Sequence, residues 1–232
     1  MKNYFYQSSK AGIINKGLLA GVLLGFLLVL LGWALAPNIN LLSVFSACTI
    51  LMIYFAAGWF GVSKIQPGII ANAGFFGLLS GTIFATEILL EYAVLPKDNT
   101  SWGIIEFSCV FTLYFLSSLA ASYRLNSIKN GIRSSILSAM LSSIIWMIFV
   151  LVTFYIFKGT TRQELVFKAE GNYQDFSLSG MTDFNSFITE DFFGAVFFHL
   201  LLSPLIASIL GTAGGWIGIT LAKLRKISPS DT

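Results

Sequence analysis

Long apolar stretches separated by short polar segments dominate the pattern of this chain. The stretches lie at residues 13–36, 41–62, 69–90, 102–123, 132–157 and 192–221. Each is long enough to cross a hydrocarbon layer of about 30 Å as a helix that rises about 1.5 Å per residue. Inside lipid, backbone polar groups must pair within the segment, so each stretch is expected to be an α-helix. The pattern predicts an all-α polytopic integral membrane protein with six transmembrane helices, formed by residues 1–232 as one domain.

The composition agrees with this pattern. Hydrophobic residues make up 56% of the chain and charged residues only 11%, whereas a soluble domain usually carries about 25% charged residues. So few charges could not cover the surface of a water-soluble fold of this size. The composition therefore excludes a soluble globular protein.

Basic residues gather on one side of the predicted helices. One side holds ten of them: Lys2, Lys10, Lys16, Lys64, Arg124, Lys129, Arg133, Lys223, Arg225 and Lys226. The other side holds four, which are Lys97, Lys158, Arg162 and Lys168. Of the acids, only Asp231 lies on the more basic side. Because cytoplasmic loops carry the excess of Lys and Arg, we expect both termini to be cytoplasmic, in a plasma or inner membrane.

A cleavable signal peptide is the alternative for the first stretch. Ala34-Leu35-Ala36 looks like a signal-peptidase site. However, the apolar run from Leu18 to Leu35 is longer than the roughly 7–15 residues of a signal-peptide core. We therefore keep six spans. A mature chain that starts at Pro37 would contradict this choice.

Two similar stretches suggest an internal repeat. Residues 56–64 read AAGWFGVSK and residues 213–223 read AGGWIGITLAK. The aromatic residues Trp59 and Trp216, with Tyr123 near the end of the fourth stretch, are expected at the membrane–water interface. If the likeness is real, the chain forms three helical hairpins of the same orientation. The alternative is that small and aromatic residues recur by chance at helix ends in lipid.

Glycines recur on three of the predicted helices. They are Gly17, Gly21 and Gly25 in the first, Gly74, Gly77 and Gly81 in the third, and Gly211, Gly214, Gly215 and Gly218 in the sixth. Small residues let helices approach closely in lipid, where no hydrophobic force drives association. Two interpretations stay open: these stripes pack helices within the chain, or one of them, the first by preference, mediates self-association or movement.

Ionisable residues within the apolar stretches are few, and such residues are functional candidates by default. Glu87 and Glu91 are four residues apart and so share one helix face. Glu106 lies early in the fourth stretch, Asp191 precedes the sixth, and His199 is the only histidine. One interpretation is an outward-facing polar pocket made by these residues. The other is that the acids lie in headgroup water.

Pro204 lies five residues after His199. Proline lacks an N–H and therefore leaves the carbonyl of Leu200 without its helical donor. In the pocket interpretation, His199 serves as a proton acceptor beside Glu87 and Glu106. In the other interpretation, His199 caps a backbone carbonyl. In either case, the sequence predicts a Leu200 carbonyl that lacks its helical donor.

The connection at residues 158–191 is the longest, and it is rich in aromatic residues. A disordered linker would hold fewer of them. We therefore expect an ordered extracytoplasmic cap with short helices. Phe184, Phe187 and Ile188 have the spacing of a small amphipathic helix at the interface.

No motif for a cofactor or a metal stands out. Cys48 and Cys109 both lie in apolar stretches, and a single histidine with scattered carboxylates has no ligand spacing. The sequence therefore predicts no cofactor, no metal site and no nucleic-acid partner. Its partners are expected to be membrane lipids, with self-association or other membrane subunits as further options.

Three classes of function fit this pattern. The favoured one is a small-solute transporter, or a subunit of one, with an outward-facing polar pocket. The alternative is a non-catalytic accessory or scaffold subunit of a membrane complex. A membrane-embedded enzyme has the weakest support, because only Glu87, Glu106 and His199 could serve as its reactive groups.

Overall fold

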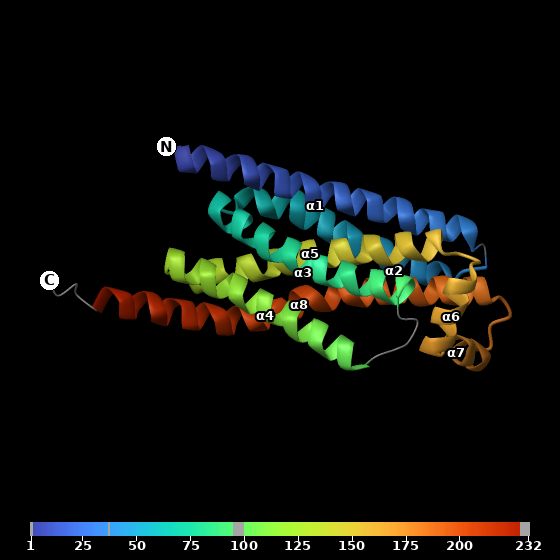
Figure 1. Ribbon diagram of the computed structural model, residues 1–232. Helices are drawn as coiled ribbons and strands as arrows, with labels where there is room; N and C mark the ends of the chain where they lie inside the picture. Colours follow the sequence, from blue (N-terminus) through green and yellow to red (C-terminus); the bar gives the residue numbers. More distant parts are fainter. Residues whose placement is uncertain (1, 37, 95–99, 228–232) are drawn as a thin grey trace.

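The computed structural model describes residues 2–36, 38–94 and 100–227 (Figure 1). Pro37, Lys97 and Asp231 lie outside these residues. The helices are α1 (Lys2–Leu35), α2 (Leu41–Ala56), α3 (Pro67–Ala93), α4 (Thr100–Leu125), α5 (Ile128–Ile156), α6 (Thr161–Glu170), α7 (Asn172–Ser179) and α8 (Phe184–Ile227). A π-helical turn, η1 (Ala57–Gly61), and a 3₁₀ turn, η2 (Val62–Lys64), follow α2. The described residues form no strand, and six helices are long and apolar enough to cross a membrane. The predicted six-helix membrane architecture is confirmed.

The long helices run side by side as a bundle with two distinct ends (Figure 1). The start of α1 and the end of α8 lie at one end, which we call the terminal end. The short helices α6 and α7 lie at the opposite end, which we call the cap end. The expected ordered connection between the fifth and sixth spans is therefore present as two helices.

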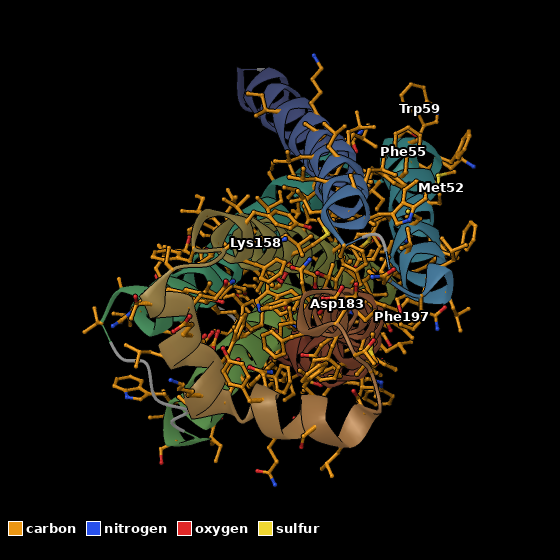
Figure 2. All side chains as sticks on the ribbon, turned by 90° about the vertical axis from the view of Figure 1, so that its right-hand side faces the viewer. Met52, Phe55, Trp59, Lys158, Asp183 and Phe197 are labelled. Carbon is orange, nitrogen blue, oxygen red and sulfur yellow. The ribbon has the colours of Figure 1, made fainter. Side chains whose placement is uncertain are left out.

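Helix α5 occupies the centre of the bundle. It packs against α1, α3, α4 and α8, and 67% of its most apolar window is buried within the protein. Helix α2 lies at the periphery, against α1 and α8. Figure 2, viewed from the cap end, shows Met52, Phe55 and Trp59 on the outer side of α2. Met52 and Trp59 are exposed there, as expected for side chains that contact lipid acyl chains.

Local sequence signals account for several helix ends. The Asn40 side chain accepts a hydrogen bond from the Leu42 N–H at 2.9 Å and so caps α2. Ser127 caps α5 and Thr160 caps α6 in the same way. Gly171, with a φ of 82°, ends α6 in the left-handed conformation that glycine adopts without strain.

Helix α8 begins earlier than the sequence pattern predicts. Phe184, Phe187 and Ile188 form its first turns, so the separate amphipathic helix expected there is absent from the described residues. At about 1.5 Å per residue, the 44 residues of α8 reach about 66 Å, twice the hydrocarbon thickness. The cause is a strong start signal at Asp183, which accepts hydrogen bonds from the Asn185 N–H at 3.1 Å and the Ser186 hydroxyl at 2.6 Å. These hydrogen bonds lower the pKa of Asp183 below its usual value.

The two similar stretches differ in their backbone. Trp59 lies in the π-helical turn η1, whereas Trp216 lies in regular α-helix within α8. Both side chains are exposed, at 57% and 65%. Tyr123 is half-buried, and its hydroxyl accepts a hydrogen bond from Arg225 at 3.2 Å. The likeness in sequence therefore does not extend to the local backbone.

Candidate functional site

Three of the predicted acidic residues come together near the cap end of α3 and α4. The rings of Phe84 and Phe107 lie 5.8 Å apart, which brings the turns that carry Glu87 and Glu106 to the same level. The charged groups that act most strongly on Glu106 are the carboxylates of Glu87 and Glu91. Helices α3 and α4 therefore present a group of carboxyls to one another.

Glu106 is the most deeply placed of these acids. Its side chain is only 8% exposed, and its Oε1 atom is buried with no hydrogen-bond partner among the described residues. Glu87 and Glu91 are half-buried. A buried polar oxygen without a donor is rare in native proteins, and it calls for a specific explanation such as a ligand.

The cap adds Glu170, a residue that the sequence analysis missed. Helix α6 docks on the end of α3, where the Arg162 guanidinium donates hydrogen bonds to the carbonyls of Tyr92 and Glu91. This docking brings the Glu170 carboxyl close enough to the Glu91 carboxyl for the two groups to act on each other electrostatically. Glu170 is exposed on the outer side of α6, but partial loss of surrounding water and the nearby Glu91 carboxyl still raise its pKa, to about 9. Asp191, exposed on α8, also acts electrostatically on Glu170.

Glutamine in place of Glu170 is expected to remove a pH dependence from the docking of α6. In the folded protein, the pKa of Glu170 is raised from its ordinary value of 4.5 to about 9. Between these two pH values, Glu170 keeps its proton in the docked state and loses it in the undocked state. The docked state therefore binds more protons than the undocked state, and it loses stability as the pH rises across this interval. Hydrogen exchange of the α6 amides from pH 5 to 9, corrected for intrinsic exchange rates, should show this loss in the native protein and much less of it in Glu170→Gln.

Glu164→Gln is the matched control, because Glu164 is an exposed acid of the same helix, as Glu170 is, but is not among the acids that act on Glu170. It should keep the native pH dependence. An unchanged pH dependence in Glu170→Gln would contradict the assignment.

His199 lies in an aromatic environment and has no hydrogen bond to the acids among the described residues. Its ring stacks on Trp146 at a centroid distance of 4.0 Å and meets the edge of Phe84 at 5.0 Å. Its Nε2 atom is buried and has no hydrogen-bond partner among the residues that the structure describes. Phe84 contacts both His199 and Phe107, and Phe107 is the residue that follows Glu106 in the sequence.

The carbonyl that Pro204 leaves without a helical donor has another partner. The Tyr54 hydroxyl on α2 donates a hydrogen bond to the Leu200 carbonyl at 2.7 Å, in a buried position. The unpaired acceptor that the sequence predicts is therefore satisfied by Tyr54, and His199 does not take this role. The sequence gives no spacing that links α2 to α8, so Tyr54 could not be selected from it.

A second group that the sequence analysis missed is a polar layer between α3, α4 and α5. Its buried serines are Ser117, Ser118, Ser122, Ser134, Ser135, Ser138, Ser142 and Ser143. Asn72 on α3 donates hydrogen bonds to the Ser117 carbonyl at 2.9 Å and to the Ser134 hydroxyl at 2.8 Å. The Ser117 hydroxyl also lies 2.8 Å from that of Ser138. The recurrence of serine every four residues in α5 was a readable signal of a polar helix face.

This layer continues toward the middle of the bundle. The Tyr114 and Ser142 hydroxyls lie 2.5 Å apart. Ser135 donates to the carbonyls of Tyr114 at 2.9 Å and Ala207 at 2.8 Å. Polar side chains therefore follow one another from Asn72 to the middle of the membrane-spanning region.

The glycines of α3 and α8 lie where helices come close. A Cβ atom at Gly77 would be 2.8 Å from the Ser138 carbonyl oxygen. One at Gly218 would be 2.6 Å from the Leu119 carbonyl oxygen. Gly211 meets Ser135 on α5, Gly214 meets the Phe115 carbonyl on α4, and Gly215 meets Ile128. These contacts leave no room for a side chain at the interfaces.

The remaining glycines differ among themselves. Gly74 meets Ile14 of α1, and Gly81 meets Ile145 of α5. In the first helix, Gly21 lies against Ile144 and Gly25 against Met147, whereas Gly17 has no atom near its Cβ position. Self-association through this stripe stays a prediction, with only Gly17 open on the surface.

Within the described ranges, no three His, Cys, Asp or Glu side chains are placed to hold a metal ion together. A lipid-facing groove between α3 and α4 is almost wholly apolar and includes the exposed Cys109. Comparisons of the chain with family models, curated proteins and solved structures found no match.

Proposed function

We propose that this protein is a small-solute transporter, or the membrane subunit of one, that receives its solute among the carboxyls of Glu87, Glu91 and Glu106 at the cap end. The observation that carries the proposal is Glu106, whose buried oxygen has no partner in the described structure. An ionisable group inside the membrane is costly to keep, and it usually marks a pathway for a substrate or an ion.

The polar layer supports a route beyond this group. Tyr114 lies two turns further along α4 than Glu106, on the same buried face. Below it, the hydroxyls of Ser142, Ser138 and Ser117 lead to Asn72 near the terminal end of α3. A solute that moves along this line meets hydrogen-bonding groups at each turn, provided by three different helices. The glycine contacts allow these helices to slide with little steric change.

Proteoliposomes that contain the purified protein test the proposal by osmotic swelling. Vesicles shrunk in glycerol, urea or acetamide re-expand as the solute enters, and light scattering follows this without a label. We expect entry of at least one solute to exceed that into protein-free vesicles by tenfold or more, and Glu106→Gln to remove most of the excess. Glu164→Gln, an exposed acid in the cap, should retain it.

Two outcomes would overturn the proposal: no solute enters faster than into empty vesicles, or Glu106→Gln conducts like the native protein. The second candidate function, an accessory subunit of a membrane complex, is favoured by the apolar groove between α3 and α4. A protein that is inert in vesicles and purifies from native membranes with a stoichiometric partner would establish it instead.

A further inference from the structure

Among the described residues, the ionisable side chains that approach one another at the cap end of α3 and α4 are mainly carboxyls. Glu87, Glu91 and Glu106 act on one another, and Glu170 joins them from α6. The nearby guanidinium of Arg162 is directed to backbone carbonyls at the end of α3. Like charges in a region of low dielectric repel one another strongly, so this group favours a bound positive charge.

A group of acids on a protein surface often binds nothing but water. This group differs from such surface groups because one of its members, Glu106, is buried. Glu106 is 8% exposed, and its Oε1 atom is shielded from solvent and accepts no hydrogen bond in the described structure. No donor among the described residues therefore satisfies this oxygen. A ligand with an N–H donor and a positive charge would do so.

Aromatic rings lie next to the acids. Phe107, which follows Glu106, contacts Phe84 at 5.8 Å and Phe111 at 5.8 Å. Phe84 in turn contacts His199, which stacks on Trp146. The faces of aromatic rings attract cations of diffuse charge such as ammonium groups. Metal ions instead require several converging oxygen or nitrogen ligands, and the described residues offer no such set.

We infer that the site formed by Glu87, Glu91 and Glu106 binds a monovalent organic cation with an ammonium group, whose N–H donors face the carboxyls and whose carbon atoms face the exposed ring of Phe107. The inference names the solute class of the proposed transporter, and in that respect it rests on the proposed function. Binding itself can be measured without transport.

Isothermal titration of the purified protein in detergent with methylammonium chloride tests the inference, with sodium chloride at equal ionic strength as the reference. We expect saturable binding of methylammonium that sodium does not displace. Glu106→Gln and Glu87→Gln should each weaken this binding tenfold or more, and Glu164→Gln should leave it unchanged. Acetamide, which has N–H donors but no charge, should bind at least tenfold more weakly.

The outcomes separate this inference from the proposed function. Transport of a neutral solute without methylammonium binding would overturn the inference and leave transport standing. Methylammonium binding without any solute flux would keep the binding site and overturn transport. If Glu106→Gln does not fold, Glu87→Gln decides, because Glu87 is half-buried at the edge of the same group. Equal losses in Glu87→Gln and Glu164→Gln would show unspecific attraction to surface charge and overturn the site.

Discussion

Leucine in place of Gly218 is expected to prevent the native packing of α8 against α4. A Cβ atom at this position would lie 2.6 Å from the carbonyl oxygen of Leu119 and 3.0 Å from the backbone nitrogen of Tyr123. Both are backbone atoms inside a helix, so neither can move away without displacing α4. Alanine at Gly218 should already cost about 1–3 kcal/mol, typical of overpacking. Leucine should abolish the monodisperse folded protein in size-exclusion chromatography.

Gly17→Leu is the matched control for this prediction. Gly17 is also a glycine within a membrane-spanning helix, but it is exposed and has no atom within 4 Å of its Cβ position. Leucine there should change the free energy of unfolding by no more than about 0.5 kcal/mol, as is usual for surface positions. A Gly218→Leu protein with native chromatographic behaviour and native melting temperature would contradict the close approach of α4 and α8.

The membrane-spanning helices were predictable because lipid imposes one simple requirement on the chain. An apolar stretch of sufficient length must form a helix there, and the predicted stretches lie within the six candidate spans or extend at most one residue beyond them. The ends were less predictable. Helix α1 already begins at Lys2 and α8 at Phe184, because the residues before each apolar run contain no proline. Hydropathy shows where a helix enters lipid, and it does not show where the helix begins.

The candidate site was predictable only in part. Glu87 and Glu106 could be selected because a carboxyl in an apolar stretch is conspicuous. Glu170 could not, since its approach to Glu91 depends on how α6 folds back over the end of α3. The stacking of His199 on Trp146 likewise joins residues of different helices, and no spacing along the chain encodes it.

The buried contact between Tyr54 and Leu200 carries the second large expected effect. Phenylalanine in place of Tyr54 should destabilise the protein by about 1–2 kcal/mol, because the Leu200 carbonyl loses its donor in a buried, apolar position. Tyr54 is 2% exposed and Leu200 is fully buried, so water cannot replace the hydroxyl. Tyr155→Phe is the matched control. The Tyr155 hydroxyl donates a hydrogen bond at 2.8 Å to the carbonyl of Leu28. This carbonyl can also accept the helical hydrogen bond from the N–H of Gly32, so loss of the Tyr155 hydroxyl should reduce the free energy of unfolding by less.

A double-mutant cycle with Pro204 tests why the Tyr54 hydroxyl is needed. In Pro204→Ala, residue 204 regains an N–H that can donate to the Leu200 carbonyl in the ordinary helical pattern. Tyr54→Phe should then cost at least about 0.5 kcal/mol less than it does beside Pro204, which is within the range measured for coupled neighbours. Denaturant titration in mixed micelles measures all four proteins. Equal costs in both backgrounds would mean that Tyr54 stabilises α8 by packing alone. The hydrogen bond from its hydroxyl to the Leu200 carbonyl would then contribute nothing to stability.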